Sequence, residues 1–168
     1  MLRSKSLAGR LNRLLRAVQP SFARPDDAWA ALRLPPLEYA VYARMDPRDR
    51  EHATRVARKL LELYEDANDE LVRAALLHDC GKLLRPYVWL ERIAAGLSHR
   101  AIAEAVLPAD WNSRRFTALE LRLLHPQIGA ALIREAGGSQ RVAQIVERHH
   151  FPNGDADAAI IHAVDELE

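Results

Sequence analysis

The chain has 168 residues, of which 49% are hydrophobic and 28% are charged, with a formal net charge of +1 and a single cysteine. This composition is that of a globular domain and excludes an intramolecular disulfide. We find neither an apolar run of about 18 residues, which a membrane span requires, nor a secretory signal, so we expect a cytoplasmic protein.

The first 24 residues are strongly basic, since they contain six Lys or Arg residues and no acid. Leucines recur beside these charges at helical spacing, which predicts a basic amphipathic helix. Such a helix can lie on a membrane surface or on nucleic acid, or it can pack its leucines on the domain. A linker, "QPSFARPDD", and a break at "LPP" follow. We therefore expect a basic helix and a linker helix over residues 1–45, and a domain over residues 46–168.

The domain is predicted to be all-α, because no alternating pattern of strand residues persists. A helix is expected in "MDPRDREHATRVARKLLELY", with Asp46 as its N-cap and Pro47 at its first position. The next helix, over about 69–79, is expected to stop at Gly81. Residues 85–115 are punctuated by Pro86, Gly96, Ser98 and Pro108 and are predicted to form a two-helix insertion that could serve as a lid.

The C-terminal half predicts further helices. "TALE" at 117–120 is a capping box, and its helix is expected to reach His125. Pro126 is then expected to begin a separate helix that closes at Gly137 and Gly138. Ser139 is predicted to cap "QRVAQIVERHH", and a last helix, "AAIIHAVDELE", follows the loop "PNGDAD".

Histidines and aspartates lie at or near the inner side or the end of these predicted helices. A lone histidine is usually structural, so only the set as a whole carries an argument. Imidazoles and carboxylates that converge from several helices are how helical bundles build metal sites. Carboxylates in apolar settings are costly unless a cation compensates them. The residues are His52, His78, Asp79, His125, His149, His150 and Asp165.

In this order the residues resemble the HD superfamily of metal-dependent phosphohydrolases. The resemblance covers about residues 46–168 and rests on "RDREHATRVA", "LLHDCGK", "LELRLLHPQIGAALI", "IVERHH" and "AVDEL". "HDxGK" and "LHPxxGAxLI" look especially like the HDIG branch, which includes HD-GYP cyclic-dinucleotide phosphodiesterases and bacterial symmetrical diadenosine-tetraphosphate hydrolases. The resemblance implies an HD-domain helical bundle, with a peripheral N-terminal basic helix and a helical insertion after the His-Asp motif.

The resemblance also implies a binuclear site for one or two divalent ions, drawn from Mn, Fe, Ni, Co or Zn. One ion would be held by His52, His78, Asp79 and Asp165, and a second by His125, His149 and His150 with Asp79 as the bridge. An alternative is that only one residue of the pair His149-His150 is a ligand and the other supports it. Asp79 and Lys82 are the implied catalytic residues, and Lys82 would point at the substrate phosphate or the activated water.

Two features depart from the HD-GYP pattern. The Glu and the Gly-Tyr-Pro motif that follow the His-His pair are replaced by "HHFPNGDAD", which argues against cyclic di-GMP cleavage. Arg48 replaces a third-metal Glu one turn before His52, so we expect two ions at most. Arg48 could face substrate phosphates or solvent, and His162 could be a substrate-side acid or a packed side chain. Cys80 is interpreted as a small hydrophobe.

We therefore expect a metal-dependent phosphohydrolase that cleaves a phosphodiester or phosphoanhydride bond of a nucleotide or dinucleotide through metal-activated water. The alternative is a metal-bound nucleotide-sensing or signalling module with weak or no catalysis. The expected partner is a nucleotide or another phosphorylated small molecule. We expect no nucleic acid, and a homodimer is compatible with the sequence.

Overall fold

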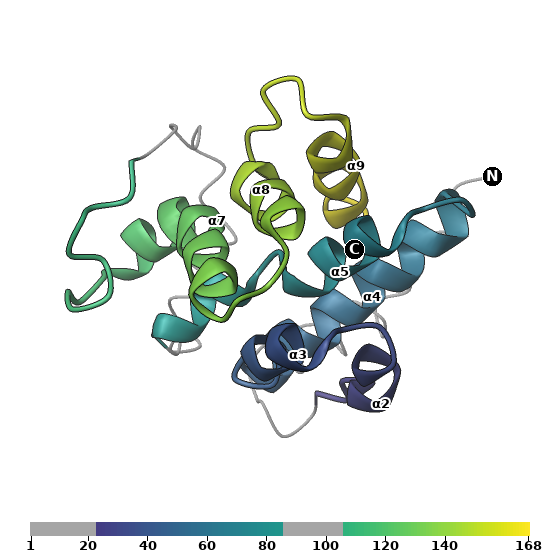
Figure 1. The fold of residues 1–168 in the computed structure, drawn as a ribbon, viewed down its shortest axis with the longest axis horizontal. Helices are drawn as coiled ribbons and strands as arrows, with labels where there is room; N and C mark the ends of the chain where they lie inside the picture. Colours follow the sequence, from purple (N-terminus) through teal and green to yellow (C-terminus); the bar gives the residue numbers. More distant parts are fainter. Residues whose placement is uncertain (1–22, 86–105) are drawn as a thin grey trace, which may run out of the picture.

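The computed structural model describes residues 23–85 and 106–168 (Figure 1). The predicted basic N-terminal helix and most of the predicted 85–115 insertion lie outside the described residues. The described residues form helices and contain no strand, which confirms the all-α fold. Within these ranges, no helix combines the length and the apolar character needed to cross a membrane.

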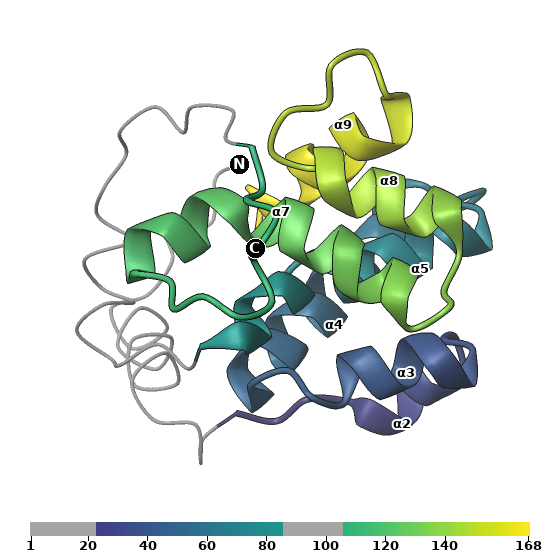
Figure 2. The same ribbon diagram turned by 60° about the vertical axis from the view of Figure 1, so that its left-hand side comes forward.

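Seven α-helices and one 3₁₀ helix are described, and the segment that carries His78 and Asp79 joins two of them. In chain order they are α2 (Asp27–Ala31), α3 (Pro36–Tyr42), α4 (Pro47–Leu63), α5 (Asp69–Leu77), η2 (Cys80–Leu84), α7 (Ala118–Glu135), α8 (Gln140–Arg148) and α9 (Ala156–Asp165). Figure 2 shows α7 running beside α8, with α2 and α3 on another side of the bundle. His78 and Asp79 lie at the junction between α5 and η2.

Polar side chains begin these helices, largely as the sequence predicts. Asp46 accepts a hydrogen bond from the backbone N–H of Arg48 at the start of α4. The capping box of α7 is present, because Thr117 and Glu120 bond each other's backbone N–H groups. Ser139 caps α8. These bonds satisfy N–H groups that a helix leaves without partners at its first turn, so the ends of the site-bearing helices are well defined.

The core lies between α4, α5, α7, α8 and α9. Its largest fully buried apolar side chains are Tyr42, Leu60, Leu76, Leu77, Leu121, Ile128, Ile133, Ile145 and Ile161. The segment before α4 joins the same core through buried Ala30, Tyr42 and Met45. The Tyr42 hydroxyl also donates to Asp27 Oδ1 over 3.1 Å, which ties α3 to α2. A domain boundary at residue 46 stays a prediction, but α2 and α3 pack as part of one core with the helices that follow.

The predicted break at Pro126 is wrong, because α7 runs from Ala118 to Glu135 as one helix with this proline inside it. A proline inside a helix removes the N–H that would bond the carbonyl four residues earlier, here that of Arg122. The ring Nδ1 of His125 lies 2.9 Å from this same carbonyl oxygen and satisfies it instead. The predicted close of the helix is confirmed: Gly137 has a φ of 79°, and Gly138 N–H bonds the carbonyl of Ile133 over 2.9 Å.

The predicted role of Gly81 as a helix stop is also wrong. Helix α5 ends at Leu77, and Gly81 lies inside η2. Among the described glycines only Gly137 and Gly154 have a positive φ. Gly81 is required for space, because a Cβ there would collide with the carbonyl oxygen of His125 and lie 2.8 Å from the Gly129 nitrogen. This glycine therefore lets the His-Asp junction pack directly on the backbone of α7.

Candidate metal centre

Five helices bring their histidines and aspartates to one place inside the bundle. His52 comes from α4, His125 from α7 and Asp165 from the last turn of α9, while the others lie just beyond α5 and α8. Neighbouring imidazole rings form an unbroken chain with centroid separations of 4.7 to 5.3 Å. The order of that chain is His52, His78, His149, His125 and His150. The sequence-predicted ligands therefore occupy one continuous cluster.

One end of the cluster is formed by His52, His78 and Asp165, whose ligand atoms all lie within 4.8 Å of one another. Asp165 Oδ1 is 2.7 Å from His52 Nε2 and 3.5 Å from His78 Nε2. His78 is fully buried, while the side chains of His52 and Asp165 are 25% and 23% exposed. This first group therefore has one side that water or a ligand can reach.

The other end is formed by His125, His149 and His150, whose ring nitrogens also lie within 4.8 Å of one another. Adjacent residues in a helix point about 100° apart, which would separate His149 from His150. The centroids of the two rings nevertheless lie 4.3 Å apart, at the point where α8 ends at Arg148 and His149 is its C-cap. The structure thus brings both histidines into this second group.

Asp79 lies between the two groups. Its Oδ2 is 3.6 Å from His78 Nε2, and its Oδ1 is 3.3 Å from His125 Nε2. One carboxylate oxygen thus faces each group. Oδ1 also accepts the ammonium of Lys82, whose Nζ lies 2.6 Å away. Asp79 has φ −96° and ψ 3° as it begins η2, and the tight 3₁₀ turn carries Lys82 back over the aspartate.

Three buried histidines hold their rings in the same way. Nδ1 of His78, His125 and His149 lies 2.9, 2.9 and 2.6 Å from the carbonyl oxygen three residues earlier in its own helix. Each Nδ1 therefore donates a proton to the backbone, which directs Nε2 into the cluster, where it offers a lone pair whenever the imidazole is neutral. These three Nε2 atoms are buried and make no hydrogen bond with the described residues.

Buried nitrogen atoms without a partner are rare in native proteins and ask for an explanation. A divalent cation accepts lone pairs from neutral imidazoles and compensates carboxylates at the same time. The donor set of five imidazoles and two carboxylates, with three of the rings already oriented by the backbone, fits such an ion. The residues present therefore suit a metal centre.

The protonation states support the same conclusion. The pKa values of His125 and His149 are lowered by burial, and burial with the nearby His125 lowers the pKa of His150 to about 3. Burial opposes ionisation of Asp79, but the Lys82 ammonium and His78 hold its pKa well below the usual range. Neutral imidazoles and an ionised carboxylate are the forms that bind a metal.

His78 differs from the other buried histidines. Burial would lower its pKa, but the carboxylates of Asp79 and Asp165 outweigh this effect and raise the pKa to about 9. Asp165 in turn has its pKa lowered by His78 and His52 in spite of burial. In the protein without metal, His78 therefore carries a positive charge that compensates the carboxylates of Asp79 and Asp165, as a bound cation would.

The remaining predicted site residues lie at the edges of the cluster or away from it. Arg48 is bound by its own helix cap, since Nε and Nη2 each lie 2.9 Å from an oxygen of Asp46. His162 is half-buried on α9, and its side chain makes no hydrogen bond or ion pair with the part of the chain the structure describes. The substrate-binding roles of Arg48 and His162 stay predictions.

The sequence analysis missed one residue that positions the site. Gly129 faces the His-Asp junction, and a Cβ there would lie 3.0 Å from Cys80 Sγ and 3.2 Å from the Gly81 nitrogen. Gly129 lies four residues after His125, on the same face of α7, and this spacing is the signal that could have identified it. Cys80, buried at this contact, packs between the two elements, and burial raises the pKa of its thiol.

Comparison with known proteins agrees with the geometry. A protein-family model, the HD domain, matches residues 50–168 of the chain, which include all seven residues of the cluster. No curated protein and no solved structure matches the chain.

Proposed function

Because this chain belongs to the HD domain family, whose members are generally metal-dependent phosphohydrolases, we propose that it hydrolyses a phosphodiester or phosphoanhydride bond of a nucleotide or dinucleotide. Within the family, the "HDCGK" and "LHPQIGAALI" stretches support a place in the HDIG branch. The single observation that carries the proposal is the set of three buried imidazoles whose Nδ1 atoms bond the backbone and whose Nε2 atoms, without hydrogen-bond partners among the described residues, point into a cluster that also holds the ionised carboxylates of Asp79 and Asp165.

The two groups would hold one ion each. His52, His78 and Asp165 would hold the first and His125, His149 and His150 the second, with one oxygen of Asp79 facing each. Divalent ions at such sites lower the pKa of water and polarise a phosphoryl oxygen. Manganese, iron, nickel, cobalt and zinc all suit mixed imidazole and carboxylate ligands.

The protein contributes a fixed positive charge through Lys82. Burial disfavours its ammonium, but Asp79 and Asp49 outweigh burial and raise the pKa of Lys82, so the side chain stays charged at neutral pH. An ammonium is a good point-charge partner for a phosphate oxygen. We assign Lys82 to the binding of the reacting phosphate and to stabilisation of the negative charge that develops on it.

One contact favours a second candidate function, a metal-bound nucleotide-sensing module with little turnover. Lys82 Nζ lies 2.6 Å from Asp79 Oδ1, the oxygen that faces the second group. If Lys82 kept this position in the loaded protein, it would compete with an ion at the second group. A protein with one ion would retain a phosphate-binding site without the full hydrolytic centre.

Metal analysis and a substrate screen test the proposal together. The metal content of the purified protein is measured for the wild type, for Asp79→Asn and for His162→Ala, a control histidine outside the two groups. Nucleotides, diadenosine polyphosphates and cyclic dinucleotides are then incubated with the protein and Mn²⁺. We expect metal in the wild type and the control, less in Asp79→Asn, and turnover of at least one nucleotide. Bound metal without any turnover would reject the enzyme, whereas a nucleotide that raises the Tm and stays intact would favour the sensing module.

A further inference from the structure

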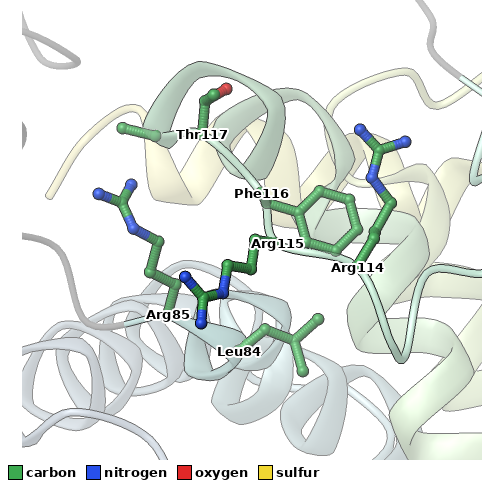
Figure 3. Close-up of a pocket in the computed structure, with 7 residues that line it drawn as sticks. Leu84, Arg85, Arg114, Arg115, Phe116 and Thr117 are labelled. Atoms are coloured by element: carbon green, nitrogen blue, oxygen red, sulfur yellow. The ribbon is translucent and has the colours of Figure 1, made fainter.

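A second positively charged feature lies where the end of η2 meets the start of α7. The structure contains a cavity of about 490 Å³, which we call the arginine pocket (Figure 3). It is lined by Leu84, Arg85, Arg114, Arg115, Phe116, Thr117 and Ala118. Arg85 follows the last residue of η2, and the other arginines lie just before α7. Two segments far apart in the sequence thus bring three arginines to the lining of one cavity.

Each of the two segments that line the pocket also carries a residue of the metal centre a few positions away along the chain. Ala118 precedes His125 by seven residues on the same helix, a rise of about 10 Å. Arg85 follows Lys82 by three residues, which is about 6 Å along a 3₁₀ helix. A ligand that reached from Lys82 to the pocket would therefore have to extend over several ångströms, as a chain of phosphates or a dinucleotide does and a single phosphate does not.

Arg114 and Arg115 differ in how far their charges are compensated. Arg114 donates to Glu120 Oε1 over 2.7 Å, and its guanidinium lies 5.1 Å from the centre of the Phe116 ring. Arg115 is exposed and makes no hydrogen bond or ion pair with the described residues. In Figure 3, Arg85 and Arg115 lie on one side of Phe116 and Arg114 on the other. Like charges in one cavity repel each other, and a bound anion would remove that repulsion.

We propose that the arginine pocket binds a phosphate group of the substrate other than the phosphate that reacts. Guanidinium groups bind phosphate through paired, charge-assisted hydrogen bonds, which an ammonium cannot supply. The substrate class is then a nucleotide with two or more phosphates, or a dinucleotide. This inference rests on the proposed function, and it names the substrate class for the same site.

Calorimetry with an inorganic probe tests the pocket without any turnover. Tripolyphosphate and inorganic phosphate are titrated into the full chain after its metal has been removed, so that neither probe can bind through an ion. The variants are Arg115→Ala and Arg115→Glu, whose exposed side chain can be changed with the fold retained, as circular dichroism would verify. Arg134→Ala is the matched control, because it removes the same charge at the far end of α7, where Arg134 binds Glu147.

We expect tripolyphosphate to bind more tightly than phosphate, and Arg115→Ala to weaken it about fivefold or more, with a larger loss for Arg115→Glu. Arg134→Ala should change the affinity by less than about twofold. If Arg115→Ala and Arg134→Ala lost the same affinity for tripolyphosphate, the anion would be attracted by the net charge of the protein alone, and the proposal would be overturned. The absence of tripolyphosphate binding by the wild type would also overturn it.

Kinetics separate this inference from the proposed function. With metal-loaded enzyme, Arg115→Ala should raise KM for a nucleoside polyphosphate and leave the hydrolysis of bis(4-nitrophenyl) phosphate, which has a single phosphate, unchanged. Equal effects on both substrates would overturn a role at a distal phosphate. If no substrate is turned over, the proposed hydrolase fails, whereas the calorimetric result still decides whether the pocket binds phosphates.

Discussion

The Nδ1 atom of His125 lies 2.9 Å from the carbonyl oxygen of Arg122, the same carbonyl that loses its helical partner because residue 126 is proline. The proline therefore leaves an acceptor free, and the imidazole takes it. This bond directs Nε2 of His125 at Asp79 and its neighbouring histidines. A residue that would ordinarily break the helix here orients a proposed metal ligand.

Replacing this proline should weaken metal binding without unfolding the protein. In Pro126→Ala, the new N–H competes with His125 for the Arg122 carbonyl, so the ring is held less firmly. We expect metal affinity at the second group to fall about tenfold, as for other partners that orient ligands. The free energy of unfolding should change by less than about 1 kcal/mol, since a helical hydrogen bond is gained. Metal titration and urea unfolding measure the two effects, and Pro108→Ala, outside the described helices, is the control.

Glycine replacements should separate close packing from backbone conformation. In Gly81→Ala the new Cβ meets the backbone of His125 and Gly129, which cannot move aside as a side chain can. We expect a loss of about 3 kcal/mol, at the upper end of overpacking. Gly154→Ala has a strained φ of 85° but open space around its Cβ, and should lose only about 1 kcal/mol. Urea unfolding of both variants tests this order, and equal losses would contradict it.

Metal uptake should release a proton from His78. The pKa of His78 is raised to about 9 in the protein without metal, so the side chain is protonated below that pH and must lose its proton to become a ligand. The apparent affinity of the first group should rise with pH up to about tenfold per unit, and level off above pH 9. The lowered pKa values of His125, His149 and His150 predict no release from the second group.

Calorimetry in buffers of different ionisation enthalpy counts the protons released. At pH 7.5 we expect about one proton for the first ion and none for the second. The variant His78→Asn should lose the release together with the affinity for the first ion. Uptake by the wild type with no pH dependence between 7 and 9 would contradict the assigned protonation state.

Removing the charge of Lys82 should reduce catalysis more than binding of metal. In Lys82→Met the ammonium beside Asp79 is lost, and with it the proposed partner of the reacting phosphate. For an enzyme we expect kcat to fall by about 100-fold or more, with metal retained at the first group. Lys82→Arg, which keeps the charge, should recover part of the activity. Steady-state kinetics and metal analysis measure both quantities, and an unchanged kcat in Lys82→Met would remove Lys82 from the catalytic residues.

Local signals predicted the ends of the helices and the identity of the clustered side chains. Asp46, Thr117 and Ser139 cap their helices because capping depends on residues only a few positions away. The ligand-type residues were found because each lies in a short motif. These features depend only on residues close together along the chain, so the sequence was sufficient to predict them.

The two errors arose where contacts made by other residues decide the outcome. Pro126 was expected to end a helix, but a side chain compensates for its missing N–H. Gly81 was expected to act through its own φ, but the backbone of α7 is what requires it. A propensity describes a residue's own conformation and cannot report a bond that a neighbouring side chain makes or a contact with another element. The Asp79–Lys82 contact and the arginine pocket likewise depend on how η2 meets α7.

His52 and Asp165 are in contact although 113 positions separate them along the chain. An ion held by both residues would link them and close most of the polypeptide into a single loop. The chain could then expand on unfolding only after the ion had dissociated. The occupancy of the metal centre would then determine how often α4 and α9 separate, and therefore how fast a protease cleaves the chain. In a cell, the supply of metal would govern the lifetime of this protein as well as its chemistry.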